Sequence, residues 1–299
     1  MSDTTVSQPR SNRLLLLFGL IFWLANAAGH LAFSRLITSA IDTPLGTLVP
    51  IHYTRPIMLL VMMIVSGLLL ARAQAAPRRL KTALCWGLLL LLMTGCTLLL
   101  MTTGVETIHF LQYGIISGLL ALALDPGRRS WPLLEIALIA LLLSVLDELN
   151  QYVYLTAVQG NYFDFNDLIL NQLGVIAGLL FYYGFSDRPA PQPGGIPGLR
   201  RGLFYLYAVL LVICLLSFLT GFMAVSPSAS VPPGGILQDG GGPTFYLQRE
   251  PRLYGNSLPT FSSGLYYVVS PLQGLLALAL LVAVCSTKLL HSFEKPVPA

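Results

Sequence analysis

The sequence predicts an all-α fold, a polytopic membrane helix bundle of about eight transmembrane helices with the N and C termini in the cytoplasm. Its 299 residues are 55% hydrophobic and 10% charged, with a mean hydropathy of +0.73, whereas ordinary soluble domains carry about 25% charged residues. Apolar stretches recur along the chain, and basic residues gather on alternate connections between them. These observations exclude a soluble globular protein. The net charge of +4 reflects membrane orientation, so nucleic acid is not expected as a partner.

Each predicted span is a run of mostly apolar residues long enough to cross the bilayer. About 20 such residues cover ~30 Å of hydrocarbon as a helix, and a helix satisfies its own backbone hydrogen bonds there. The second run is the shortest. In order, the spans are predicted at residues 14–34, 56–71, 82–103, 106–124, 133–154, 167–185, 203–224 and 265–285.

The connections set the orientation, because cytoplasmic loops retain Lys and Arg. With the N terminus inside, 13 of the 17 basic residues fall on the cytoplasmic side, and only Arg35, Arg55, Arg249 and Arg252 fall outside. The expected location is a bacterial inner (cytoplasmic) membrane, with multiple passes. The first span also resembles a cleavable signal peptide, but its apolar character continues to Phe33, which favours a retained helix.

Composition divides the chain into four parts. Residues 1–81 hold two helices, residues 82–186 a four-helix core, and residues 203–299 two further helices with an outer loop at 225–264. Residues 187–202 form a cytoplasmic linker rich in Pro and Gly, a composition typical of a flexible joint.

Ionisable residues concentrate at the outer ends of the fourth, fifth and sixth spans. A charge at the centre of a membrane helix costs about 2.5–3.5 kcal/mol, and less near the interface, so such residues need a reason. No Lys or Arg occurs in the two outer connections there. The acidic residues concerned are Glu106, Asp147, Glu148, Asp164 and Asp167.

Helical phase places these residues on faces that can meet. At 100° per residue, Glu106 shares a face with His109 and Tyr113, and Asp147 shares one with Gln151. In the sixth span, Asp164, Asp167, Asn171, Gly174 and Gly178 share a face, and the glycines allow another helix to approach closely. Three polar stripes at one depth predict a pocket that opens to the outer face.

Simpler roles exist for each residue alone. Asp164 and Asp167 are suited to helix N-caps, Glu106 to a helix start, His109 to a satisfied core position, and Asn171 to an interhelical contact. Asn26 and His30, at i and i+4 in the first span, are interpreted as packing polarity.

Three segments carry a family resemblance: VETIHFLQYG, LLSVLDELNQ and FDFNDLILNQLGVIAG. They resemble the VanZ-like family of membrane proteins over roughly residues 83–186. The matching positions are Glu106, His109, Phe110 and Tyr113, then Asp147, Glu148 and Gln151, then Asp167, Asn171, Gly174 and Gly178.

Two positions depart from the family pattern. Asn150 replaces a common His, and Asn161 replaces an Arg six residues before the Asp, which removes an anion-binding group. The family is named after an accessory protein of glycopeptide-antibiotic resistance, so the resemblance implies work at the cell envelope.

The site suits two classes of function. As an enzyme, it would act on a lipid-linked or envelope substrate, with Glu106, His109, Asp147, Glu148 and Asp167 as catalytic groups and Tyr113, Gln151, Asp164 and Asn171 as substrate-binding groups. Crowded carboxylates favour proton transfer, and a divalent cation held by Glu106, His109 and Asp167 would be an alternative that relieves their repulsion. As a non-enzymatic protein, it would bind or transport a cationic or lipid ligand, or serve as a scaffold. Membrane lipid is the expected partner in each case.

Overall fold

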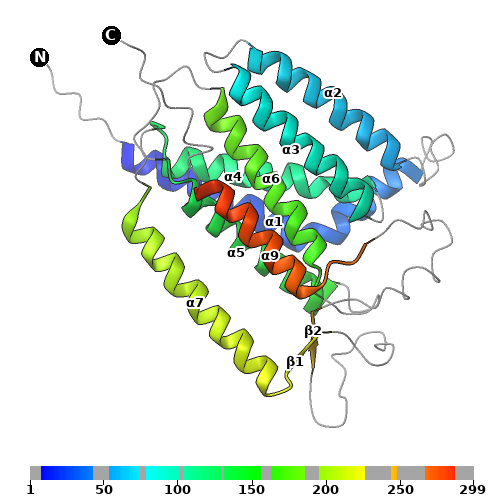
Figure 1. Ribbon diagram of the computed structural model, residues 1–299, viewed down its shortest axis with the longest axis vertical. Coiled ribbons are helices and arrows are strands. Elements are labelled where there is room, and N and C mark those ends of the chain that lie inside the picture. Colours follow the sequence, from blue (N-terminus) through cyan, green and yellow to red (C-terminus); the bar gives the residue numbers. More distant parts are fainter. Residues whose placement is uncertain are drawn as a thin grey trace, which may run out of the picture.

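The computed structural model describes residues 8–42, 54–74, 79–101, 104–128, 131–155, 163–185, 195–225, 244–247 and 267–286. Eight α-helices occur within these residues, together with a short 3₁₀ turn, a π-helical turn and two very short strands (Figure 1). The helices are α1 Gln8–Asp42, α2 Thr54–Gln74, α3 Arg79–Leu99, α4 Ile108–Leu124, α5 Leu133–Asn150, α6 Phe165–Gly184, α7 Pro197–Leu219 and α9 Pro271–Ser286.

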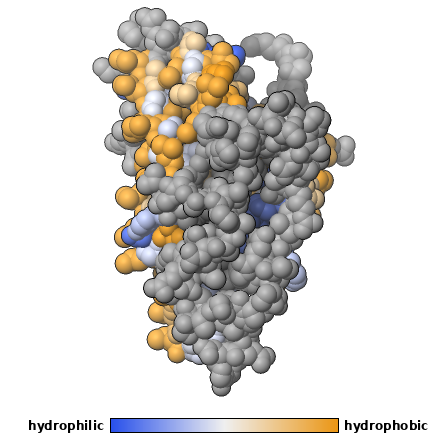
Figure 2. All heavy atoms as spheres, turned by 90° about the vertical axis from the view of Figure 1, so that its right-hand side faces the viewer, coloured by the Kyte–Doolittle hydropathy of each residue, from blue (hydrophilic) through white to orange (hydrophobic). Residues whose placement is uncertain are grey.

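Four of the described helices are long and apolar enough to cross a membrane. They contain Asn12–His30, Leu80–Leu99, Phe165–Gly184 and Pro197–Leu219, while Leu59–Arg72, Ile108–Leu124 and Pro271–Ser286 are apolar but shorter. Much of the coloured surface in Figure 2 is hydrophobic, as expected of a protein that faces lipid. The helical membrane-compatible fold is therefore confirmed, whereas the count of eight spans and the side of each terminus stay predictions.

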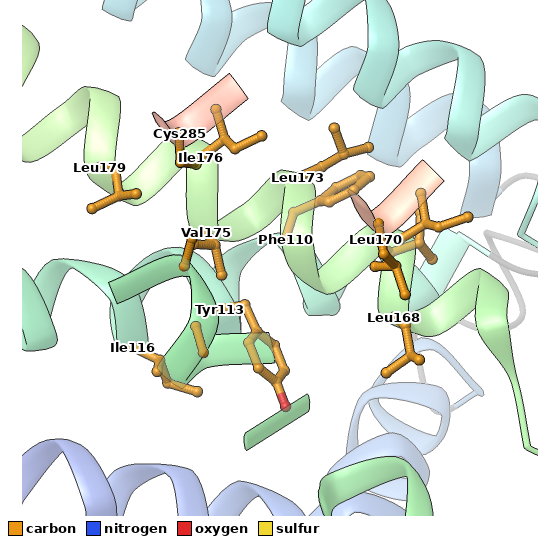
Figure 3. Packing of buried hydrophobic residues seen from close by; sticks show 14 of the residues in the cluster. Phe110, Tyr113, Ile116, Leu168, Leu170, Leu173, Val175, Ile176, Leu179 and Cys285 are labelled. Carbon is orange, nitrogen blue, oxygen red and sulfur yellow. The ribbon is translucent and has the colours of Figure 1, made fainter. Parts of the chain in front are cut away.

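The centre of the bundle is the contact between α4 and α6. Of the residues in the apolar stretch of α6, 78% are buried, against 6% for α7. Figure 3 shows Phe110 and Tyr113 of α4 beside Leu173 and Val175 of α6. α6 contacts α3, α5 and α9 as well, so it positions the polar residues at its own start relative to four other helices.

Glycines on α6 bring the backbones of α4 and α6 together. A Cβ atom added to Gly174 would lie 2.6 Å from the backbone oxygen of Phe110, and one added to Gly178 would collide with the backbone oxygen of Gly114 and with Ser117 Oγ. Ser117 Oγ also donates to the Val175 carbonyl at 3.1 Å. Any larger residue would push the helices apart, so these glycines set the distance across this contact.

α7 lies at the edge of the bundle (Figure 1). It begins at Pro197, inside the segment that the sequence suggested as a linker, because Pro is well accommodated in the first turn of a helix. Two polar contacts hold it to α5: Tyr207 donates to the Leu138 carbonyl at 2.7 Å, and Arg200 pairs with Glu135. Residues 187–194 of the predicted linker lie outside the described residues.

A small parallel pairing joins the end of α7 to the predicted outer loop. Strand β1, Met223–Ala224, pairs with β2, Phe245–Tyr246. Apart from residues 244–247, and 225 beside β1, the loop at 225–264 lies outside the described residues, as does Asn161.

Candidate functional site

The predicted polar residues lie where α4 begins, α5 ends and α6 begins. Glu106 is in the 3₁₀ turn Gly104–Thr107 before α4, and Gln151 opens the π-helical turn Gln151–Leu155 after α5. Asp164 caps α6. The name acidic end is used below for this group, which comprises Glu106, His109, Tyr113, Asp147, Glu148, Gln151, Asp164, Asp167 and Asn171.

His109 connects α4 to α6 through both of its ring nitrogens. Nδ1 lies 3.0 Å from Asn171 Oδ1, and Nε2 lies 3.7 Å from Asp167 Oδ2. Asn171 Nδ2 donates to Ser144 Oγ at 2.8 Å, which leaves the amide oxygen of Asn171 to accept from the imidazole. The hydrogen-bond network therefore assigns a proton to Nδ1. Nε2 is then the nitrogen that can gain or release a proton beside Asp167.

Tyr113 and Asp147 join α4 to α5. The Tyr113 hydroxyl donates to Asp147 Oδ2 at 3.4 Å, and both residues are buried. Asp147 also interacts electrostatically with His109, and Gln151 lies beside it. The predicted faces of the fourth and fifth spans thus meet in the structure.

Glu148 and Asp164 join α5 to the start of α6. Glu148 Oε1 accepts a hydrogen bond from the Asp164 amide at 2.9 Å, and the Asp164 side chain accepts from the Asn166 amide at 2.9 Å. Asp164 is therefore an N-cap, the simpler role that the sequence suggested for it. Burial, and then the neighbouring carboxylate of Asp167, raise the pKa of Asp164.

The five carboxylates of the acidic end lie close enough to repel one another. Glu106 interacts electrostatically with Asp164 and Asp167, and Glu148 interacts with Asp147, Asp164 and Asp167. Among the side chains that the structure describes, which leave out those of Arg35 and Arg55, no Lys or Arg pairs with Asp147, Glu148 or Asp167. The structure thus brings the nine predicted residues together, while their roles remain predictions.

Metal ligation is a further predicted role of the carboxylates. Among the described residues, no group of three His, Cys, Asp or Glu side chains converges closely enough to hold a metal ion, and this covers the predicted set Glu106, His109 and Asp167. His109 is instead occupied at Nδ1 by Asn171 and faces a single carboxylate at Nε2. The metal set Glu106, His109 and Asp167 therefore stays a prediction, and the function proposed below does not depend on it.

Comparison with known families identifies the chain. The family model described as VanZ/LLP1 matches residues 12–186. This protein belongs to the VanZ/LLP1 family. The match runs from α1 to the end of α6, so it includes the first two helices, which the sequence resemblance over residues 83–186 left out. No curated protein and no solved structure matches significantly.

α1, now part of the VanZ/LLP1 region, reaches the acidic end. The His30 ring lies beside the His109 ring, with centroids 5.8 Å apart, and Gln112 Nε2 donates to Asn26 Oδ1 at 3.0 Å. The sequence signal for this contact was the i, i+4 pair of polar residues in an apolar helix, for which packing polarity was favoured over a place in the site. His30 is therefore a further residue of the site.

One of the two departures from the family pattern has a structural role. Asn150, which replaces a common His, donates to the Ala27 carbonyl at 2.9 Å. Trp23 Nε1 likewise donates to the Leu143 carbonyl at 3.1 Å. In this VanZ/LLP1 protein, these two bonds fasten α1 to α5 next to the acidic end.

Asn166 is a second residue that sequence reasoning missed. Its Nδ2 donates to the carbonyls of Leu100 and Tyr267 at 2.9 and 2.8 Å, and its Oδ1 accepts from the Val269 amide at 3.0 Å. It thereby joins the end of α3 and the chain before α9 to the start of α6. No helical period distinguishes such a residue, because its partners come from distant parts of the chain.

Strand β2 packs against residues next to the acidic end. The Tyr246 amide donates to the Tyr152 hydroxyl at 3.1 Å, and the Phe163 amide donates to the Tyr246 carbonyl at 3.0 Å. The Phe245 ring packs on Tyr152, with centroids 4.1 Å apart. A short piece of the predicted outer loop therefore covers the junction of α5 and α6.

Proposed function

We propose that this protein is a multi-pass membrane protein of the bacterial cell envelope whose acidic end lies at the extracytoplasmic face and acts by acid–base chemistry on a lipid-linked or other envelope substrate. The observation that carries the proposal is the arrangement of His109. Asn171 holds the imidazole at Nδ1, and Asp167 lies beyond Nε2. An imidazole so oriented can transfer a proton at one defined atom.

The neighbouring side chains support a proton-transfer role for His109. Asp167 places a carboxylate oxygen 3.7 Å from Nε2, the atom at which the proton would be transferred. The Asp167 side chain is 18% exposed, against 3% for His109, so a substrate would reach the imidazole from the side of Asp167. Tyr113, Asp147 and Glu148 line the same region and would position polar groups of the substrate.

Transport is the less supported alternative. A through-pathway would need polar residues along the other halves of α4 and α6. Those halves pack mainly through buried apolar residues, including Ile116, Leu120, Ile176 and Leu179, and the hydroxyl of the buried Ser117 there bonds to the Gly114 and Val175 carbonyls. This favours a closed site at one end of the bundle.

The acid–base role is tested by genetic complementation with a chemical measurement. Lipid-linked precursors and phospholipids are extracted from a strain lacking this gene and compared by mass spectrometry after complementation with variants. Wild type and the control Tyr207→Phe, which lies in α7, are expected to restore the wild-type lipid profile, whereas His109→Gln and Asp167→Asn are not. Full restoration by His109→Gln at wild-type protein levels would overturn the proposal.

The extracytoplasmic position is tested by labelling single cysteines with a membrane-impermeant maleimide. Thr156→Cys lies in the connection next to the acidic end, and Ser130→Cys lies in the connection at the other end of α5. Thr156→Cys is expected to be labelled in intact cells, and Ser130→Cys only after permeabilisation. The reverse pattern would place the acidic end in the cytoplasm.

A further inference from the structure

Two buried carboxylate oxygens at the acidic end lack a hydrogen-bond donor. They are Glu148 Oε2 and Asp147 Oδ1, on residues that are 3% and 4% exposed. The other oxygen of each carboxylate is occupied, by the Asp164 amide and the Tyr113 hydroxyl. Buried polar groups in folded proteins are nearly always paired. Among the described residues, the donor that these two oxygens need is missing.

Charge indicates what kind of donor is missing. At the start of α5, Glu135 Oε2 also lacks a donor, but Arg200 neutralises that carboxylate at 2.9 Å. At the end of α5, no Lys or Arg whose side chain the structure describes pairs with Asp147, Glu148 or Asp167, and of these three carboxylates His109 directly contacts only Asp167. A buried charge requires a partner of opposite sign. A cation would supply the missing donors together with the opposite charge, and a proton on the carboxyl group is the alternative that removes the charge.

The arrangement of the carboxylates favours an organic cation over a metal ion. Three protein ligands do not converge on a metal position in the described part of the chain. A primary ammonium instead carries N–H donors in different directions, so two of them would serve Glu148 Oε2 and Asp147 Oδ1. A quaternary ammonium has no N–H and would leave the oxygens unpaired.

We propose that the acidic end binds the primary ammonium of an ethanolamine-type lipid headgroup. This inference rests on the proposed function and names the substrate class of the same site. The headgroup would enter beside Asp167, whose side chain is the more exposed one, and pair with Glu148 and Asp147 behind it. A lipid is the expected source because exposed apolar side chains lie near this end of the helices, including Leu111, Leu146 and Val153.

The test compares lipids of identical acyl chains and different headgroups on the purified full-length protein. Native mass spectrometry measures competition between phosphatidylethanolamine, phosphatidylcholine and phosphatidylglycerol. The expected result is a preference for phosphatidylethanolamine over the other two of about tenfold, the size of effect expected from a hydrogen bond to a charged group. Equal binding of phosphatidylcholine would overturn the N–H requirement, and equal binding of all three lipids would overturn the inference.

Variants locate the preference. Glu148→Gln and Asp147→Asn keep the size of the side chain and are expected to lose the preference, whereas Glu135→Gln, a buried acid at the other end of α5, is expected to keep it. Persistence of the full preference in the double variant Asp147→Asn and Glu148→Gln would contradict the assignment. So would its loss in Glu135→Gln with a folded protein.

Two further arms separate the alternatives. Displacement of the bound lipid by soluble phosphoethanolamine would show that a free amine satisfies the site as well as a lipid headgroup, and would overturn the lipid source while keeping the ammonium chemistry. If no ammonium preference is found but His109→Gln still fails to complement, the ammonium inference is wrong and the proposed function stands. If the preference is found and His109→Gln complements, the ammonium inference stands and the proposed function is wrong.

Discussion

The two ends of α5 each bury a glutamate, and they treat it differently. Glu135 in the first turn is fully buried, and its Oε1 accepts from Arg200 Nε and from the Ile196 amide, both at 2.9 Å. Glu148 near the last turn is equally buried but receives only the Asp164 amide and faces other carboxylates. The first is neutralised by the chain itself. The second lacks such a partner in the described chain, which is the pattern of a site that awaits a ligand or a proton.

The backbone around Glu135 is adapted to that pairing. Gly195 has a φ of +60°, in the left-handed region that favours glycine. A Cβ atom there would collide with the Arg200 guanidinium and with the Glu135 carboxylate. The chain before α7 therefore forms a fitted cover over Glu135. The acidic end has a covering strand in β2, but that strand contributes backbone and aromatic contacts and no cation.

The largest expected effect comes from the glycine contact on which the acidic end depends. Gly178→Ala places a Cβ atom against the Gly114 carbonyl and Ser117 Oγ, so α4 and α6 must separate. We expect a loss of more than about 3 kcal/mol in the free energy of unfolding, measured by thermal unfolding of the purified protein in detergent micelles. Gly118→Ala is the matched control, because nothing lies within 4 Å of its added Cβ. An equal effect of the two substitutions would contradict the close α4–α6 contact.

Much of this contact was predictable from sequence. The 100° period placed His109 and Tyr113 on one face of the fourth span, and Asn171, Gly174 and Gly178 on one face of the sixth. The length of the apolar runs and the placement of basic residues on alternate connections predicted the helices themselves. Both signals are local to a single helix, and the structure joins the two predicted faces.

What was missed depends on partners far apart in the chain. His30 lies beside His109, and Asn166 bonds to residues before α9. These partners are far apart in the sequence, so the periodicity of a single helix does not predict them. The start of α7 was placed too late because the Pro and Gly composition before it is typical of a joint, although Pro197 begins the helix. Asp164 was assigned to binding as well as to capping, and the cap is the contact that the structure establishes.

The second effect concerns the neutralised end. Arg200→Met removes the cation from Glu135 and leaves a buried carboxylate without its partner. We expect a loss of about 3 kcal/mol, at the low end for a buried pair because the Arg200 side chain is 38% exposed. Arg201→Met, at an exposed neighbouring position, is expected to change stability by less than about 0.5 kcal/mol. If the two variants unfold at the same temperature, the ion pair contributes little and the contrast between the ends of α5 weakens.

The third effect has the opposite sign at the acidic end. Glu148→Gln can retain an oxygen for the Asp164 amide while it removes a negative charge from a group of carboxylates. We expect unchanged stability or a gain of roughly 1 kcal/mol, together with loss of complementation, since functional groups are often held at a cost to stability. Glu135→Gln is expected to lower the thermal midpoint instead. A loss of more than about 1 kcal/mol in Glu148→Gln would show that Glu148 is a structural acid like Glu135.

The smallest effect tests how α7 is attached. Tyr207→Phe removes the hydroxyl that donates to the Leu138 carbonyl at 2.7 Å, and this carbonyl belongs to α5 between its two glutamates. A single neutral hydrogen bond contributes about 1 kcal/mol, which corresponds to roughly 2–4 °C in thermal midpoint for a chain near this size. Tyr205→Phe, at a residue that is 67% exposed, is the matched control and should leave the midpoint unchanged.

Because only 6% of the residues in the apolar stretch of α7 are buried, the Tyr207 and Arg200 contacts should account for much of its attachment to the described bundle. The double variant Tyr207→Phe with Arg200→Met should then make α7 accessible to protease well below the temperature at which the α4–α6 contact unfolds. If α7 and the α4–α6 contact unfold together, α7 is an integral part of the bundle rather than an addition to its edge.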